Sequence, residues 1–230
     1  MPTHNIPFGQ PMLDQDEIDA VTKVLKGPIL AHGSVCLEFE EAFAKHIGVD
    51  HAISVSSGTS GLHLSLFSRQ IGLGDEVIVP AMTHVATAHA VEYWSAKPIF
   101  VDGDPKSGNI ASDVIPTQIT ENTKSIMVVH FLGLPCDMDK INADAEKHQL
   151  FVIEDAALAV DALYGETKAG ALGNVGCFSF YPIKHMTTIE GGMVTTNDPE
   201  LAESVRKRKA FGYDHSCLLY TSDAADESSS

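Results

Sequence analysis

In the stretch Leu150-Phe-Val-Ile-Glu-Asp-Ala-Ala157, four apolar residues are followed by two acidic ones. Four consecutive apolar residues directly after a segment with helical periodicity, 138–148, predict a strand at 150–154. The strand ends where the acids begin, so Asp155 would lie at the carboxyl edge of a sheet. The same order of helix and strand is found in most of the remaining chain.

Helical patterns and short apolar runs alternate in both directions from this point. Strands are predicted at 52–55, 76–79, 98–101, 125–130, 150–154, 177–181 and 192–196. Helices are predicted between and around them, at 16–26, 37–46, 60–71, 85–94, 138–148 and 199–209. This alternation, with short connections, indicates an α/β fold with a mostly parallel sheet flanked by helices. Ligands of such sheets bind beyond the carboxyl ends of the strands.

The composition is that of an ordinary globular protein, because 44% of the 230 residues are hydrophobic and 20% are charged. No apolar run approaches the ~20 residues of a membrane-spanning helix, and the polar N-terminus lacks the features of a secretory signal. A net charge of −16 argues against nucleic acids and anionic membranes as partners. Cys36, Cys136, Cys177 and Cys217 lie far apart without metal-binding spacing, which favours reduced thiols in a cytoplasmic protein with no metal site.

Residues 216–230 differ in character from the rest of the chain. The string Cys217-Leu-Leu-Tyr-Thr-Ser-Asp-Ala-Ala-Asp-Glu227 resembles the translation of a sequencing adapter, and three serines follow it. The alternative is an acidic, serine-rich native tail, which would have a similar composition. We interpret residues 1–215 as one incomplete domain and residues 216–230 as a non-native tail.

A run of small and hydroxylated residues, Ile53-Ser-Val-Ser-Ser-Gly-Thr-Ser-Gly-Leu62, joins a predicted strand to a predicted helix. Small residues let the backbone approach a ligand, and a helix N-terminus offers unpaired N–H groups, so the run could bind a phosphate monoester. Plain helix capping is the alternative. The pattern is neither G-x-G-x-x-G nor G-x-x-x-x-G-K-[ST], which argues against dinucleotides and nucleoside triphosphates.

Two charged residues follow later strands. A carboxylate buried at a strand end needs a charged or hydrogen-bonding partner, and a protonated ring nitrogen could be the partner of Asp155; an N-cap or a salt bridge is the alternative role. Lys184 follows an apolar strand in Gly176-Cys-Phe-Ser-Phe-Tyr-Pro-Ile-Lys184. A desolvated lysine becomes a nucleophilic amine, whereas a lone loop lysine is ordinarily a solvated surface charge. A phosphate cup, an acid and a lysine in this order are the three groups that pyridoxal phosphate requires.

The sequence resembles the DegT/DnrJ/EryC1/StrS family of pyridoxal-phosphate sugar aminotransferases, which have fold type I, the fold of aspartate aminotransferase. The resemblance extends from Ile6 to Gly212 and rests on ordered blocks: Val55-Ser-Ser-Gly-Thr-Ser-Gly61, Gly74-Asp-Glu-Val-Ile-Val-Pro80, Val129-His-Phe-Leu-Gly133, Glu154-Asp-Ala-Ala157, Phe178-Ser-Phe-Tyr-Pro-Ile-Lys184 and Glu190-Gly-Gly-Met193. It implies that this chain forms the large domain and lacks the small C-terminal domain.

The resemblance also assigns roles to single residues. Lys184 would bind the cofactor covalently and then carry the proton between substrate and cofactor, and Asp155 would keep the ring nitrogen protonated. Gly58, Thr59 and Ser179 would bind the phosphate, and His84 takes the place of an aromatic residue that stacks on the ring. One position departs from the family pattern: Leu158 stands where Gln or His is usual, and its side chain can neither donate nor accept a hydrogen bond.

The implied reaction has two halves. Glutamate leaves its amino group on the cofactor, and a nucleotide-linked keto-deoxysugar then receives it, at an active site formed in a homodimer. Two alternatives stay open. A sugar dehydratase of the same family would carry histidine in place of the lysine, whereas here Lys184 holds the position and His185 follows it. A truncated family member without catalytic activity is the other.

Overall fold

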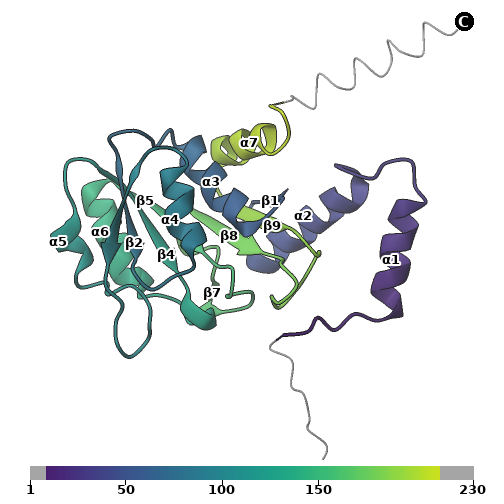
Figure 1. Ribbon diagram of the computed structural model, residues 1–230, viewed down its shortest axis with the longest axis horizontal. Helices are drawn as coiled ribbons and strands as arrows, with labels where there is room; N and C mark the ends of the chain where they lie inside the picture. The colour runs from purple at the N-terminus through teal and green to yellow at the C-terminus, as the bar shows by residue number, and fades with distance from the viewer. Residues whose placement is uncertain (1–8, 213–230) are drawn as a thin grey trace, which may run out of the picture.

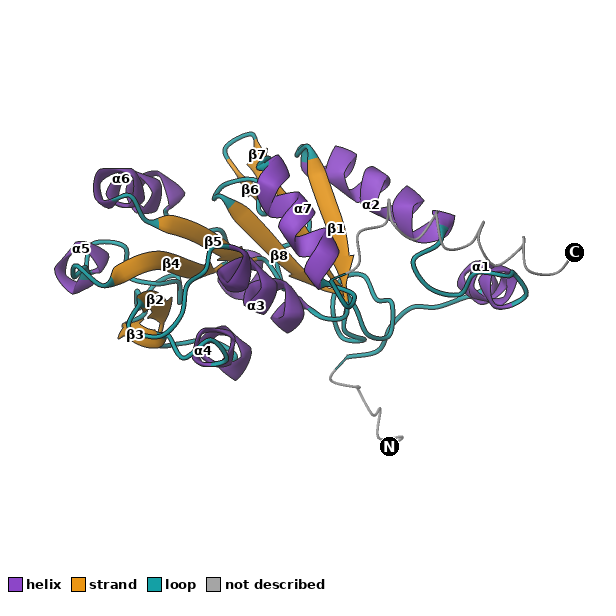
Figure 2. Cartoon of the chain, turned by 90° about the horizontal axis from the view of Figure 1, so that it is seen from above, coloured by secondary structure: helices purple, strands orange, loops and turns teal. Residues whose placement is uncertain are grey.

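The computed structural model of the chain describes residues 9–212, so the tail interpreted above as non-native lies outside the described residues. A seven-stranded sheet forms the centre, in the order β1-β9-β8-β5-β4-β2-β3 (Figures 1 and 2). Its strands are β1 His51–Val55, β2 Glu76–Pro80, β3 Lys97–Val101, β4 Thr123–Val129, β5 Phe151–Asp155, β8 Val175–Ser179 and β9 Gly192–Thr196.

The sheet is mostly parallel, as predicted. Four adjacent pairs are parallel: β8 with β5, β5 with β4, β4 with β2, and β2 with β3. Strand β9 is antiparallel to both of its neighbours, β1 and β8. Strand β1 therefore runs in the same direction as the parallel set, and six strands end at the same edge of the sheet.

Helices cover both faces of the sheet (Figure 2). Helices α3 Gly58–Ser68, α4 Val85–Glu92 and α7 Pro199–Arg208 pack on one face, through the buried side chains of Leu62, Leu66, Val91 and Val205. Helices α2 Ser34–Ile47, α5 Ile115–Gln118 and α6 Met138–His148 pack on the other face. The alternation of side chains along β5 sends Phe151 and Ile153 to the α3 face and Val152 to the α6 face.

Helix α1, Gln15–Leu25, stands apart from this body (Figure 1). Asp14 and Glu17 form a capping box at its start, which explains why the helix begins there. None of its residues is buried, and three of its apolar side chains, Ile18, Val21 and Leu25, are more than half exposed. This helix is held by local interactions and not by packing on the sheet.

The predicted strands and long helices are all present; α6 and β9 have the predicted bounds, and the others are shifted at one or both ends. The strand predicted at 177–181 ends at Ser179, because the chain then turns and the Lys184 N–H donates to the carbonyl of Tyr181. The helix predicted at 60–71 starts at Gly58 and ends at Ser68, two residues before Gln70 takes a left-handed conformation. The sequence did not predict α5, the 3₁₀ turn Phe131–Gly133, or the hairpin of β6 Leu163–Tyr164 and β7 Thr167–Lys168. Within residues 9–212, no helix combines the length and apolarity that a bilayer span requires.

Candidate active site

The sheet gathers most of the predicted site residues at one edge. The carboxyl ends of β1, β8 and β5 bring together Val55, Ser179 and Asp155, and Lys184 lies in the loop after β8. Gly192, the first residue of β9, pairs with both Val55 and Ser179 at this edge. This is the edge at which ligands bind in sheets of this kind.

The start of α3 follows β1 directly and forms a cup for an anion. Ser57 is the N-cap, and its hydroxyl accepts the N–H of Ser60 at 3.0 Å. Gly58 and Thr59 are the first two residues of the helix, so their N–H groups have no acceptor within it. The positive end of the helix dipole adds to these donors. The local chemistry suits a phosphate group.

Close packing explains the glycine in this cup. A Cβ on Gly58 would lie 3.0 Å from the Cβ of Ser179 and 3.2 Å from the carbonyl oxygen of Phe178. The absence of a side chain lets the start of α3 approach the end of β8. Ser179, which is half-buried, is thereby brought next to the cup; its contact with a phosphate stays a prediction.

Asp155 is a buried carboxylate with one hydrogen-bond donor on each oxygen. The N–H of Ala157 donates to Oδ1 at 3.1 Å, and the hydroxyl of Thr87 donates to Oδ2 at 3.2 Å. Burial raises the pKa of Asp155, while these two bonds and the charge of Lys184 act to lower it. A cation beside the carboxylate would offset the cost of its burial.

Lys184 is half-buried in the loop between β8 and β9. Burial lowers the pKa of its amine, and the negative charge of Asp155 acts in the opposite direction. The net effect is an amine that loses its proton more readily than an ordinary lysine, which is what a nucleophile needs.

His84 is the N-cap of α4, where its Nδ1 accepts the N–H of Ala86 at 3.2 Å. Its side chain is exposed, and Thr87, which contacts Asp155, follows one turn later. Stacking of His84 on a cofactor ring stays a prediction. Leu158, the departure from the family pattern, is half-buried.

Residues 11–223 match the family model of the DegT/DnrJ/EryC1/StrS aminotransferase family. The chain belongs to this family. GDP-perosamine synthase from Caulobacter vibrioides is 46% identical over 210 residues, which are 91% of this chain and 57% of that protein. The crystal structure of an aminotransferase from Psychrobacter cryohalolentis superposes with a TM-score of 0.88 at 41% identity, covering 92% of this chain and 55% of that one.

A sugar dehydratase has the same fold. GDP-4-keto-6-deoxymannose-3-dehydratase, in a structure with a trapped adduct of pyridoxal phosphate and glutamate, superposes with a TM-score of 0.86 at 30% identity. The match covers 91% of this chain and 56% of that one. The chain thus spans little more than half the length of the relatives that it matches, and it has the fold type I architecture of these enzymes.

The chain contains a buried pair that its sequence did not predict. His130 and Glu154 are both fully buried, and His130 Nε2 lies 2.8 Å from Glu154 Oε2. The N–H of Cys136 donates to His130 Nδ1, so the proton of the neutral ring is on Nε2 and is donated to Glu154. Glu154 also accepts three backbone N–H groups, those of Gly170, Leu172 and Gly173.

The alternation along β5 could have indicated this pair. Two consecutive acids at the end of a strand point to opposite faces, so only one of Glu154 and Asp155 can face α4. Asp155 does so, and Glu154 instead fixes the loop that leads into β8. Glu154 is a structural residue next to a candidate site residue.

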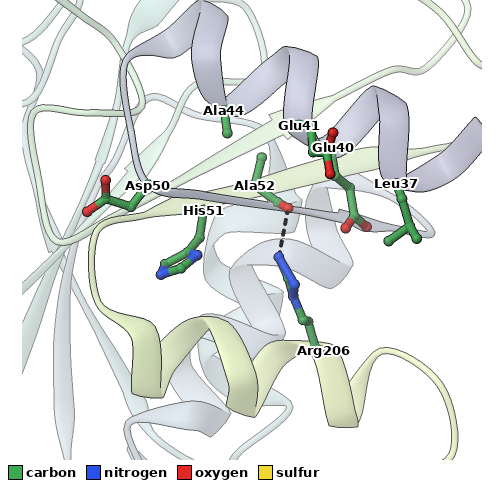
Figure 3. Close-up of a pocket in the computed structure, with 8 residues that line it drawn as sticks. All are labelled: Leu37, Glu40, Glu41, Ala44, Asp50, His51, Ala52 and Arg206. Atoms are coloured by element: carbon green, nitrogen blue, oxygen red, sulfur yellow. Dashed lines mark hydrogen bonds between the residues drawn. The ribbon is translucent and has the colours of Figure 1, made fainter. Parts of the chain in front are cut away.

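A pocket of about 130 Å³ lies between α2, α7 and the start of β1 (Figure 3). It is lined by Leu37, Glu40, Glu41, Ala44, Asp50, His51, Ala52 and Arg206. Arg206 Nη2 donates to the carbonyl of Ala52 at 3.5 Å, and its buried Nε has no partner among the described residues. Because this pocket is at the amino end of β1, it lies at the opposite edge of the sheet from the candidate site. No group of three potential metal ligands is found in the described part of the chain.

Proposed function

We propose that this chain is the cofactor-binding part of a pyridoxal-phosphate-dependent sugar aminotransferase. The observation that carries the proposal is the meeting of three groups at one sheet edge: the anion cup at the start of α3, the buried carboxylate of Asp155, and the half-buried amine of Lys184. The relatives named above as an aminotransferase and a perosamine synthase support the same activity.

The residues at this edge fit pyridoxal phosphate. The free N–H groups of Gly58 and Thr59, with the hydroxyl of Ser179, would bind the phosphate. Asp155 would accept a hydrogen bond from the protonated ring nitrogen, whose charge offsets the burial of the carboxylate. When bound, the cofactor supplies an electron sink for the bonds at the amino-bearing carbon.

Two side chains would act around this ring. Lys184 Nζ can take up a proton and return it to a carbon held beside it, because burial lowers the pKa of this amine. His84, at the start of α4, would cover one face of the ring. Leu158 offers no hydrogen bond beside the ring, so the chain would hold the ring through the contacts just named.

We propose glutamate as the amino donor and a nucleotide-linked keto-deoxysugar as the acceptor, in the biosynthesis of amino sugars for polysaccharides or glycosylated metabolites. The name of GDP-perosamine synthase and the glutamate adduct of the dehydratase support these substrates. The full-length protein would be a cytoplasmic homodimer, with part of each site supplied by the partner subunit.

The covalent role of Lys184 can be tested directly. The purified protein is incubated with pyridoxal phosphate, reduced with borohydride and mapped by peptide mass spectrometry. A pyridoxyl group on Lys184 is expected, and Lys184→Ala should abolish both the label and turnover. A label on another lysine, or none in folded protein, would reject the assignment and favour a family member without catalytic activity.

A dehydratase is the second candidate, favoured by the structural match to GDP-4-keto-6-deoxymannose-3-dehydratase. The two activities differ in where the amino group of glutamate ends and in what happens to the sugar. A transaminase should release one 2-oxoglutarate for each amino sugar formed. Release of a deoxygenated sugar that has lost a hydroxyl and gained no amino group would instead identify the dehydratase. The lysine at position 184 favours transamination.

A further inference from the structure

Two threonines of the α4 region form a chain of hydroxyl groups that ends on Asp155. Thr87 is fully buried, and its hydroxyl donates to Asp155 Oδ2 at 3.2 Å. The Thr83 and Thr87 oxygens are 2.8 Å apart. Because the single proton of Thr87 is used by Asp155, Thr83 must be the donor in the second bond. The two hydroxyl dipoles therefore point in series toward the carboxylate.

This contact is long for a bond between a hydroxyl and a carboxylate, but it is made in a buried setting. Asp155 is 7% exposed, and a hydrogen bond to a charged group in such a site is worth more than one in water. Within residues 9–212, the Asp155 carboxylate accepts one hydrogen bond from a side chain, that of Thr87. Its other donor is the backbone N–H of Ala157. The Thr87 hydroxyl is held in this direction by its two contacts, with Thr83 on one side and Asp155 on the other.

The charged and titratable groups around Asp155 come from three other strands and loops. Lys184 approaches from the loop after β8, His130 from the end of β4, and Cys177 from within β8. Glu154 precedes Asp155 but faces the opposite side of the sheet. None of these groups hydrogen-bonds the Asp155 carboxylate in the described chain, which leaves its orientation to Thr87 and Ala157.

We propose that Thr87, supported by Thr83, is a positioning residue that fixes the orientation and charge of Asp155 toward the ring nitrogen of the cofactor. The proposal rests on the proposed function. Helix α4 thereby contributes twice to the site: His84 at its N-cap toward the ring face, and Thr87 one turn later toward the residue that binds the ring nitrogen.

The test reads the ring nitrogen itself. Wild-type protein and Thr87→Val, which removes only the hydroxyl, are loaded with pyridoxal phosphate labelled with ¹⁵N in the ring. At one pH, the ¹⁵N chemical shift of the wild type should be that of a protonated ring, and that of Thr87→Val should move toward the neutral ring. The dissociation constant for the cofactor should rise about tenfold, as expected for the loss of one hydrogen bond to a charged group. Thr87→Ser should restore both values.

Thr195→Val is the matched control. Thr195 is also fully buried, and its hydroxyl donates to the carbonyl of Gly170 at 2.7 Å, away from Asp155. It should leave the ¹⁵N shift unchanged. Thr83→Val keeps the Thr87 hydroxyl and should give a smaller shift in the same direction, and it decides the matter if Thr87→Val does not fold.

Each remaining outcome counts against the proposal. An unchanged shift and affinity in Thr87→Val, or in Thr83→Val if only that variant folds, would overturn it. An equal change in Thr195→Val would mean that loss of any buried hydroxyl has this effect through packing, and it would also overturn the proposal. Wild-type protein that is folded but does not bind the cofactor would remove the proposed function and this inference together, whereas a wild type with a protonated ring and an unaffected Thr87→Val would remove the inference alone.

Discussion

Gly192 lies so close to Ser57 that a Cβ on Gly192 would be 2.5 Å from the Ser57 carbonyl carbon and 2.7 Å from the nitrogen of Gly58. Strand β9 begins at this glycine and pairs on both sides there, with Val55 of β1 and Ser179 of β8. A side chain at this position would collide with the backbone that forms the anion cup. The start of α3 and the end of β8 can therefore lie this close to β9 only because position 192 has no side chain.

Gly192→Ala should therefore damage the cup more than the fold. Overpacking of this kind costs about 1–3 kcal/mol of stability, and displacement of the Gly58 N–H should weaken binding of pyridoxal phosphate by about tenfold or more. Fluorescence titration with the cofactor and urea denaturation measure the two effects. Gly103→Ala is the control, because a Cβ there would have its nearest neighbour at an ordinary 3.5 Å. Equal affinities in wild type and Gly192→Ala would show that the cup does not bind the cofactor.

The buried pair of His130 and Glu154 should matter for stability. Glu154→Gln replaces one acceptor oxygen by a donor that faces N–H groups, either those of Gly170 and His130 or those of Leu172 and Gly173. Because two buried N–H groups would lose their acceptor, this variant should lower the free energy of unfolding by about 3 kcal/mol. Urea denaturation checks the value.

Glu203→Gln is the control for that variant, since the ion pair of Glu203 with Lys207 is largely exposed and should change stability by less than about 0.5 kcal/mol. If Glu154→Gln were as mild as this control, the loop before β8 would have to be held by other contacts.

Much of this architecture follows from local patterns. The apolar run 150–153 and the helical segment before it are enough to predict β5 and α6, and the end of the strand places Asp155 at the sheet edge. The order of the sheet does not follow from such patterns. Strand β9 inserts between β1 and β8, and nothing in the sequence of Gly192–Thr196 says that it pairs with a strand near the start of the chain.

For the candidate site too, local patterns indicate single residues but not the contacts between distant parts of the chain. Residues at strand ends and helix starts, such as Gly58 and Asp155, can be found from the sequence, although their roles came from the resemblance to a family. The contact between Thr87 and Asp155 joins residues 68 positions apart and exists only after α4 has packed on the sheet. The hairpin β6–β7 was missed because two-residue strands carry no periodicity.

Glu40 should make stability depend on pH in the acid range. It is buried, and its carboxylate accepts the Lys209 Nζ–H at 2.8 Å and the Ser54 N–H at 2.8 Å. Burial by itself raises the pKa of Glu40, but the bonds from Lys209 and Ser54 outweigh it, so the pKa falls below its ordinary value of 4.5. A lowered pKa in the folded chain means that the stabilisation is complete above pH 4.5 and is lost as the pH falls through the folded pKa.

Lys209→Met should remove this effect. At neutral pH it should lower the free energy of unfolding by about 3 kcal/mol, because it leaves the charge of Glu40 buried and without its cation. The loss of stability below pH 4.5 should become shallower than in the wild type. Lys140→Met, which breaks only exposed ion pairs with Asp113 and Asp137, is the control. Parallel pH profiles for Lys209→Met and wild type would exclude Glu40 as a source of the acid sensitivity.

The amine of Lys184 should be reactive at a lower pH than an ordinary lysine. Burial lowers its pKa more than the charge of Asp155 raises it, so the neutral, nucleophilic form is populated earlier as the pH rises. In cofactor-free protein, trace labelling with acetic anhydride at a series of pH values, followed by peptide mass spectrometry, gives the midpoint for each lysine. The midpoint for Lys184 is expected below that of the exposed Lys45 in the same sample. Asp155→Asn removes the opposing charge and should move the midpoint of Lys184 lower still. A midpoint for Lys184 at or above that of Lys45 would mean that the amine is solvated, and its use as a nucleophile would then depend on the cofactor or on a partner subunit.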